Sequence, residues 1–268
     1  MLPPGAINAS EDDSYQIGKH SGFVFILPYL EETAIHDAYD LSQPWTSPNN
    51  QLVAQMAIDT LLCPSNKSEV PEVGGMPGAP TDYAFSKGPL AYFCATELIG
   101  LGPFDVNSKI RLGQITDGTS KTFAMGEAAS NPDLTAESIC VGTEEWMGQV
   151  WAKGNFDGGC SGQHLGGHGS VLAVTSQNPG YDDQFLTPDD QLATLNVEPV
   201  RASIDFQQGT NCQDFQDRVR GFFAYHPGGA HFVMVDGSVH FITESISPKV
   251  YRDLSTIAGG ETVDAGDE

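Results

Sequence analysis

The stretch YHPGGAHFVMVDGSVHF, residues 225–241, constrains the fold more than any other part of the chain. It contains two β-rich runs, His231 to Val235 and Val239 to Thr243, joined at Asp236-Gly237-Ser238. Asp-Gly is typical of a type I′ turn and Gly-Ser of a type II′ turn, and both turns close two-residue hairpins. The sequence therefore predicts an antiparallel hairpin and a sheet to which it belongs.

Either turn would place two histidines of this hairpin on one face of the sheet. Because residues directly opposite one another share a face, we expect His231 and His240 on the same side as Val233, Val235 and Ile242. Both sides are mostly apolar, which predicts a central strand pair covered on both faces. Its histidines then need hydrogen-bond partners rather than metals. The face of the hairpin opposite His231 and His240 would carry Phe232, Met234, Val239 and Phe241.

Proline and glycine divide the rest of the chain into short elements. Residues 20–40 predict two short helices, or one helix kinked at Pro28, because proline removes an intrahelical hydrogen bond. Residues 49–58 predict a further helix, followed by a buried extended segment at residues 60–63. Further strands are expected at residues 82–85 and 122–126 and around residues 146–151, and a last helix at residues 250–257, N-capped by Ser247 with Pro248 at its first position.

The fold class follows from this order of elements. The 268 residues include 30 Gly and 17 Pro, which is typical of a turn-rich globular chain with little long helix. We expect one α+β domain over residues 1–268, with an antiparallel sheet, short helices and long loops. Its parts are a mostly helical segment at residues 1–60, the sheet with its loops at residues 61–246, and a C-terminal helix and acidic tail at residues 247–268.

The charge of the chain limits its partners. With 35 Asp and Glu against 12 Lys and Arg, the net charge is −23, so we expect neither nucleic acid nor an anionic membrane surface as a partner. The sequence contains no apolar run long enough to span a bilayer. The acidic clusters lack the spacing of a calcium loop, so calcium stays open without a motif, and we expect no cofactor.

The histidines offer one candidate for chemistry. His231 and His240 could approach diagonally across the hairpin and, with His226 and Asp236, form the site of a metal-dependent hydrolase. Asp236 lies in the turn, however, too far along the strand to join them easily. The sequence has no nucleophile elbow and no phosphate-binding glycine loop. We therefore expect no metal site and no catalytic residue.

Several motifs follow one another in a recognisable order. After His226 come nine residues and then Asp236-Gly237. The other motifs are LPPG at the start, SGFVFILPYLEET from residue 21, LLCPS from residue 61, DYA from residue 82, RLGQITDGTSKTFAMGE from residue 111 and VYRDLSTIAGGE from residue 250. Together they resemble the prepilin-type processing-associated domain family known by the pattern "H, any nine, D-G", which is abundant in planctomycete-like bacteria.

The resemblance implies a pseudopilin-like globular domain. Such domains follow a prepilin-type leader and a long hydrophobic helix, as in type IV pilins and in the pseudopilins of type II secretion. The chain then begins near the end of that helix, and LPPG marks a truncation. We expect a non-catalytic structural subunit of a cell-surface or type II secretion-like filament, at the cell surface or in the periplasm and anchored in the inner membrane before assembly. Its partners are other pilin-like subunits, and both they and the membrane are contacted through that helix.

The resemblance also assigns roles to residues. It implies a structural role for His226, Pro227, Gly228, Gly229, Asp236 and Gly237. The family commonly has Asn where this chain has His231 and Arg where it has His240, which argues against a shared metal site. A disulfide between Cys63 and Cys212 is implied by their family-like positions, with Cys140–Cys160 as a second pair.

Two other functions stay open beside the structural one. A binding module could capture a polysaccharide or an exported protein through the loops at residues 153–191, with Trp146 and Trp151 as stacking platforms. Packing in the core is the alternative role for both tryptophans. The metal-dependent hydrolase centred on the hairpin histidines is the third.

Overall fold

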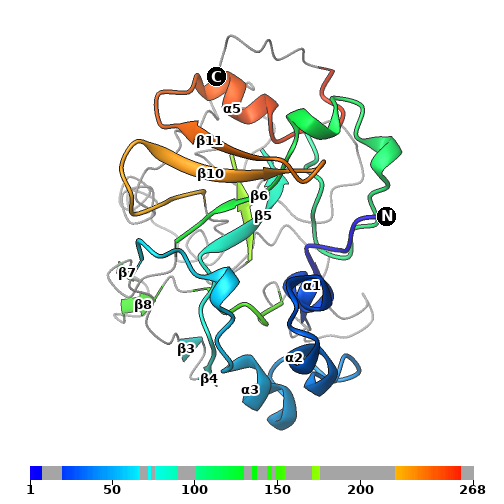
Figure 1. Cartoon of the computed structure of the whole chain (residues 1–268), viewed down its shortest axis with the longest axis vertical. Coiled ribbons are helices and arrows are strands. Elements are labelled where there is room, and N and C mark those ends of the chain that lie inside the picture. Colours follow the sequence, from blue (N-terminus) through cyan, green and yellow to red (C-terminus); the bar gives the residue numbers. More distant parts are fainter. Residues whose placement is uncertain are drawn as a thin grey trace, which may run out of the picture.

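The computed structural model describes residues 1–7, 20–66, 72–73, 76–89, 100–129, 135–137, 144–146, 149–154, 171–175 and 221–260 of the chain. They form an α+β architecture, as expected, in which short helices lie on both sides of a five-stranded sheet (Figure 1). The sheet has the order β11-β10-β6-β5-β9. Its strands are β5 (Tyr83–Gly88), β6 (Phe123–Glu127), β9 (Leu172–Val174), β10 (Gly229–Met234) and β11 (Val239–Thr243).

The sheet is mainly antiparallel. The pairs β11-β10, β10-β6 and β6-β5 are antiparallel, whereas β9 pairs with β5 in parallel. In the described part of the chain, three further strand pairs lie outside this sheet. They are β1 (Ala6–Ile7) with β2 (His20–Ser21), β3 (Glu72–Val73) with β4 (Met76–Pro77), and β7 (Thr135–Glu137) with β8 (Glu144–Trp146).

The helices are short, and at the N-terminal end proline and a left-handed residue interrupt them. Pro28 ends the first α-helix and starts a 3₁₀ turn, which closes at Glu31 with a left-handed φ of 64°. Within the described residues no helix is long and apolar enough to cross a membrane. The helical elements are α1 (Phe23–Ile26), η1 (Leu27–Leu30), α2 (Thr33–Ala38), α3 (Pro48–Ala54), η2 (Asp59–Leu61), η3 (Leu112–Gln114), η4 (Thr119–Lys121) and α5 (Pro248–Asp253).

Three of the predicted elements differ from the structure in their bounds or type. The helix expected at residues 49–58 ends at Ala54, and the segment expected to be extended at residues 60–63 begins as the 3₁₀ turn η2. The C-terminal helix starts as predicted, with Ser247 at the N-cap and Pro248 at its first position, but it ends at Asp253 instead of Ile257. Ser47 caps α3 by accepting the N–H of Asn50, whereas Ser247 makes no such side-chain bond at α5.

One face of the sheet packs against α5. Its centre is a stack of Phe123 and Phe232, whose ring centroids are 4.1 Å apart, and Tyr251 of α5 closes over both rings. Ala84 and Met234 extend this apolar surface, and all of these side chains are buried. Burial of this face fixes which residues of β10 point away from α5.

The opposite face packs against the N-terminal helices. Phe85 of β5 lies between Phe23 of α1 and Phe104, with ring centroids 4.6 Å and 4.8 Å apart. Trp151 is also part of this core and donates its indole N–H to the carbonyl of Met56 at 3.0 Å. In Figure 1 helices α1, α2 and α3 lie at one end of the molecule and α5 at the other.

The predicted hairpin is confirmed, but its register is not the predicted one. Val233 pairs with Val239, and Met234 donates its N–H to the carbonyl of Ser238 at 2.8 Å. The loop therefore holds residues 235–237, with Gly237 at a φ of 89°. This is a type I turn followed by a left-handed glycine, one residue longer than an Asp-Gly turn.

The longer loop moves one histidine to the other face. His231 pairs with Phe241, and Phe232 pairs with His240, so His231 and His240 lie on opposite sides of the sheet. The expectation that they share a face is wrong, because a slip of one residue exchanges the two faces of a strand. The hairpin was also expected to be a central strand pair covered on both faces, and this is wrong. Strand β11 is an edge of the described sheet, and Phe241 on it is 45% exposed.

Candidate functional site

A carboxylate at the end of β6 joins several segments. The side chain of Glu127 is 4% exposed. Its Oε2 accepts the backbone N–H of His231 at 2.7 Å, and it lies 3.0 Å from Nε2 of His226 and 3.2 Å from Nδ1 of His231. Three donors on one oxygen compensate the cost of burying this carboxylate.

The sheet register explains where Glu127 lies. It is directly opposite Tyr83 on β5, and the register that pairs Phe232 with Gly126 brings His231 beside it on β10. Tyr83, Glu127, His231 and Phe241 therefore form a row across four strands on the face turned away from α5.

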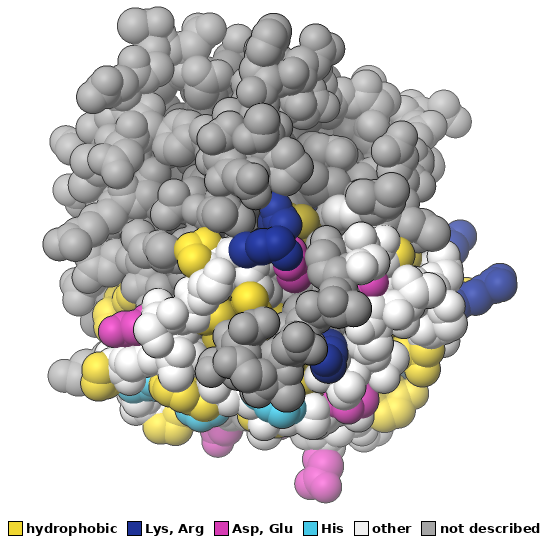
Figure 2. Space-filling model, turned by 90° about the horizontal axis from the view of Figure 1, so that it is seen from above, with side chains coloured by type: hydrophobic (Ala, Val, Ile, Leu, Met, Phe, Trp, Pro, Cys, Tyr) yellow, Lys and Arg dark blue, Asp and Glu magenta, His cyan; other side chains and the backbone are white. Residues whose placement is uncertain are grey.

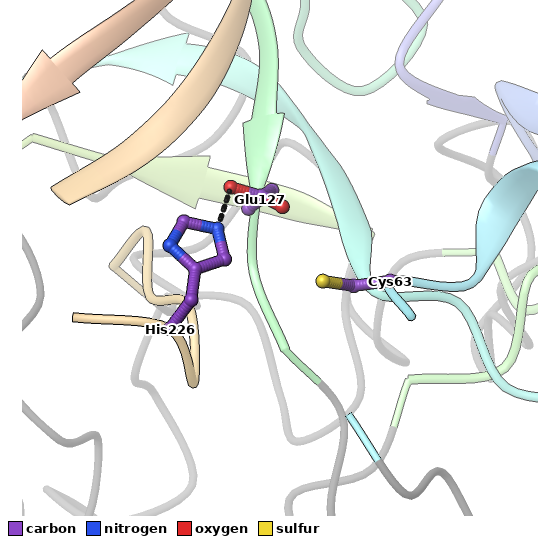
Figure 3. Close-up of side chains that lie close together, drawn as sticks. All are labelled: Cys63, Glu127 and His226. Atoms are coloured by element: carbon purple, nitrogen blue, oxygen red, sulfur yellow. Dashed lines mark hydrogen bonds and ion pairs between the residues drawn. The ribbon is translucent and has the colours of Figure 1, made fainter. Parts of the chain in front are cut away.

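Cys63 approaches the same carboxylate from the loop after η2. Its Sγ, a carboxylate oxygen of Glu127 and a ring nitrogen of His226 all lie within 4.8 Å of one another. Figure 3 shows His226 bonded to one oxygen of Glu127, while the sulfur of Cys63 points toward the carboxylate from the other side. Within the described residues this is the group of ligand atoms suited to hold a metal ion.

A second buried carboxylate fixes the backbone of Cys63. Asp82, which is fully buried, accepts the N–H of Cys63 at 2.8 Å and the side-chain amide of Asn66 at 2.6 Å. Since Asp82 immediately precedes β5, these bonds attach the cysteine loop to the start of that strand. The position of the thiol is thus set before any ligand binds.

The electrostatics of the site keep the thiol protonated. Burial raises the pKa of Cys63, and the negative charges of Glu127 and Asp82 raise it further. Burial also raises the pKa of Tyr83 to about 12, with Glu127 as the next cause. Because the thiolate is the nucleophilic form of cysteine, this arrangement does not resemble an activated cysteine–histidine pair. It can act as a hydrogen-bonded brace or as a set of metal ligands.

One side of the cluster reaches the surface. The rings of His226, His231 and Phe241 contact one another, with centroids 5.0–5.9 Å apart. The side chain of His231 is 50% exposed and that of His226 is 21% exposed. Figure 2 shows histidine side chains at the surface beside hydrophobic ones along one edge of the described part. Solvent therefore reaches the cluster from the His231 side.

The segment after His226 reverses the chain sharply. Gly228 has a φ of 96° and Gly229 a φ of 152°, and the carbonyl of Gly228 accepts the N–H of Glu244 at 2.9 Å. At the other end of β10, Asp236 accepts both the N–H and the hydroxyl of Ser238, and these bonds lower the pKa of the Asp236 carboxyl. Both ends of β10 are thus held by residues of the His226 to Gly237 pattern.

The metal site considered from the sequence is not formed. Of His226, His231, His240 and Asp236, the structure brings together only the first two. His240 lies on the other face with its Nε2 3.1 Å from the hydroxyl of Ser238, and Asp236 caps the turn. The reason is the three-residue loop, which the sequence did not reveal.

Glu127 was missed by sequence reasoning. It stands at the end of the motif RLGQITDGTSKTFAMGE, but a single glutamate after a strand carries no ligand spacing. The signal that could have found it is alternation, because Glu127 is an acidic residue at the end of a strand whose other residues are apolar or glycine and are buried or half-buried.

The tryptophan and cysteine predictions have different outcomes. Trp151 is fully buried, so its role as a stacking platform is wrong and core packing applies. The side chain of Trp146 and most of residues 153–191 lie outside the described residues. Among the described residues Cys63 is a free cysteine. Cys140, Cys160 and Cys212 lie outside the described part, so both disulfides stay predictions.

Fold and site together define an α+β domain whose sheet is braced by a buried carboxylate, histidines and a thiol. Residues 1–249 match the model of a family described as "Protein of unknown function (DUF1559)". The chain belongs to this family. The comparison with curated proteins and the comparison with solved structures found no match.

Proposed function

We propose that the chain is a non-catalytic structural subunit, the globular domain of a pseudopilin-like or type IV pilin-like protein. It would belong to a filament of the cell surface or of a type II secretion-like system. The proposal starts from the ordered motifs that resemble the "H, any nine, D-G" family. The main supporting observation is that His226, Asp236 and Gly237, the residues of this pattern, make the contacts and the turn that hold the β10–β11 hairpin.

Each part of the pattern holds the edge hairpin. His226 binds Glu127 and thereby attaches the start of β10 to β6. Asp236 and Gly237 form the turn, and the N–H of Asp236 donates to the carbonyl of Thr119 at 3.0 Å. These bonds support a structural role for the pattern residues. The raised pKa of the Cys63 thiol supports a site without a cysteine nucleophile, because the thiolate is the nucleophilic form.

The N-terminal helical end offers surface for contacts between subunits. Tyr29 is 85% exposed and Leu52 is 69% exposed, and Leu41 and Met56 are about half exposed. Covering such side chains between copies would contribute roughly 25 cal/mol for each Å² of apolar surface removed from water. The acidic remainder of the chain would face solvent.

The proposal also specifies partners and location. In pseudopilin-like proteins a hydrophobic helix N-terminal to the globular domain packs in the filament core. Contacts with other pilin-like subunits, and with the membrane before assembly, would run through such a helix. The location would be the cell surface or the periplasm.

Site-specific photo-crosslinking in the producing bacterium tests the proposal. A photoreactive residue replaces Leu52 in one strain and Leu112 in the control strain. Leu112 is 51% exposed and belongs to η3, not to α1–α3. We expect Leu52 to give covalent multimers of the chain in a sheared cell-surface fraction and Leu112 to give far fewer. Recovery of the chain solely as a monomer, with no multimers from either position, would contradict the proposal.

A further inference from the structure

Three side chains from distant parts of the sequence meet at one point of the structure. The thiol of Cys63, a carboxylate oxygen of Glu127 and a ring nitrogen of His226 lie within 4.8 Å of one another. In a tetrahedral zinc site with metal–ligand distances of 2.0–2.3 Å, neighbouring ligand atoms are roughly 3.5 Å apart. Since 4.8 Å exceeds this separation by about 1.3 Å, shifts of at most about 1.3 Å would bring the three atoms to ligand distance.

We propose that Cys63, Glu127 and His226 form a zinc site. Sulfur, imidazole nitrogen and carboxylate oxygen are the three donor types that Zn²⁺ accepts in four-coordinate sites. Calcium and magnesium take oxygen ligands almost exclusively, so a thiol and an imidazole select against both ions. The site goes beyond the structural role proposed above, because a filament subunit can exist with or without a metal.

Charge balance favours a divalent cation at this point. Binding of Zn²⁺ to Cys63 breaks the S–H bond and releases the thiol proton to solvent. The resulting thiolate and an ionised Glu127 together carry two negative charges, which Zn²⁺ neutralises. Asp82, fully buried behind Cys63, adds negative potential from the side of β5. Binding of the ion would thus replace a thiol facing buried carboxylates by a neutral metal–ligand group.

The surrounding bonds orient the ligands in advance. The N–H of His231 holds Oε2 of Glu127 at 2.7 Å, and Asp82 holds the backbone of Cys63. Such outer hydrogen bonds fix the direction of metal ligands and strengthen binding. A water molecule entering beside the half-exposed His231 completes the four ligands.

The position of the ligands gives the ion a structural effect. Cys63 follows η2, Glu127 ends β6, and His226 precedes β10, so one ion would join three segments that are 64 and 99 residues apart in sequence. Binding to the native state alone then stabilises the fold by mass action. The site and a Cys63–Cys212 disulfide exclude each other, since both use the same sulfur.

The test uses the full chain, purified without a metal-affinity resin under reducing conditions and then stripped by a chelator. Co²⁺ is titrated first, because a thiolate ligand gives a sulfur-to-cobalt charge-transfer band and tetrahedral geometry gives intense visible bands. Zn²⁺ is then added to displace Co²⁺, and bound metal is counted by mass spectrometry. We expect one metal ion per chain, the thiolate band, and a higher unfolding midpoint with zinc.

Variants separate this site from unspecific binding. Losing an outer partner of a metal ligand already weakens affinity by about 10–100-fold, so Cys63→Ser and Glu127→Gln should each cost at least about 100-fold. His240→Gln is the matched control on the same hairpin but the other face, and should change affinity less than about twofold. If Glu127→Gln does not fold, as judged by circular dichroism, Cys63→Ser decides, because it leaves the bonds of Glu127 to both histidines in place.

Four results would overturn the zinc site. The first is wild-type protein that folds but binds neither Co²⁺ nor Zn²⁺. The second is a Cys63→Ser variant that binds as tightly as wild type. The third is a wild-type cobalt complex without the thiolate band. The fourth is peptide mapping of protein purified without reductant that finds Cys63 in a disulfide. None of these would bear on filament formation, so the structural role keeps its own test.

Discussion

Replacing Gly229 by alanine should be the most damaging single-methyl change in the hairpin. Gly229 has a φ of 152°, which side-chain-bearing residues rarely adopt. A Cβ atom there would lie 2.0 Å from the carbonyl oxygen of Ile242 and 2.9 Å from Cα of Thr243. Both atoms belong to the backbone of β11, so they cannot rotate away. Either the strands separate or Gly229 changes conformation.

The structure gives a magnitude for this change. Backbone strain costs about 1–3 kcal/mol, and forcing an extra methyl group into a packed region costs roughly a further 1–3 kcal/mol. We therefore expect Gly229→Ala to lower the free energy of unfolding by about 2–6 kcal/mol. The free energy of unfolding of native domains is only about 5–15 kcal/mol, so a loss of this size is a large fraction of the total stability.

Two other glycines provide a graded control. Gly237 has a φ of 89°, but a Cβ atom there meets nothing within 4 Å. Gly237→Ala should therefore cost only the left-handed strain, about 1–2 kcal/mol. Gly113 has neither a positive φ nor a neighbour within 4 Å. Gly113→Ala should leave stability unchanged or raise it by up to about 1 kcal/mol.

Urea unfolding measures the series. Fluorescence of the buried Trp45 and Trp151 reports the transition, and equal m-values would show that the unfolded states are comparable. The expected order of stability is Gly113→Ala, then Gly237→Ala, then Gly229→Ala. If Gly229→Ala were no less stable than Gly237→Ala, the close approach of β10 and β11 at this position would be refuted.

Three further predictions rest on single side chains. Phe232→Ala should cost about 3–5 kcal/mol in urea unfolding, since its buried ring stacks in the core, whereas Val239→Ala, 63% exposed, should change stability by less than about 0.5 kcal/mol. The pKa of Tyr83, raised from 10.0 to about 12, means that its neutral form contributes stability that is intact below pH 10 and lost as pH rises toward 12. Between pH 10 and 12 the urea midpoint of wild type should therefore fall more steeply than that of Tyr83→Phe. Tyr29 is 85% exposed, so Tyr29→Phe should follow wild type. Equal pH dependence of Tyr83→Phe and wild type would contradict the role of Tyr83. Asp117 accepts one hydroxyl and two glycine amides after α5, so Asp117→Asn should cost about 1–3 kcal/mol and speed hydrogen exchange of those amides. Unchanged exchange would show that these bonds do not hold the C-terminal segment.

Several features of the fold could be predicted because they depend on neighbouring residues. Pro28 ends a helix through its own ring, and Pro248 starts one with its fixed φ. The turn residues 236–238 stop one strand and start the next. Each of these effects acts over a few positions along the chain, so the α+β class and the hairpin could be obtained from the sequence.

The turn length was decided by tertiary contacts. Asp-Gly suits a two-residue turn, but it also suits a longer loop with glycine in the left-handed position. The N–H of Val235 donates to the carbonyl of Thr122, and the N–H of Asp236 to that of Thr119. These bonds to another segment are made by the longer loop, and they place His231 and His240 on opposite faces.

The candidate site was decided in the same way. Cys63 and His226 could be named from the sequence motifs, whereas Glu127 could not. No feature of the linear sequence indicates that the three side chains come together. Their proximity requires the order of the strands, the register between β6 and β10, and a loop held by Asp82. Sequence determines elements through short-range sterics and alternation, whereas a site built from distant segments exists only after the sheet has paired and its faces have been buried.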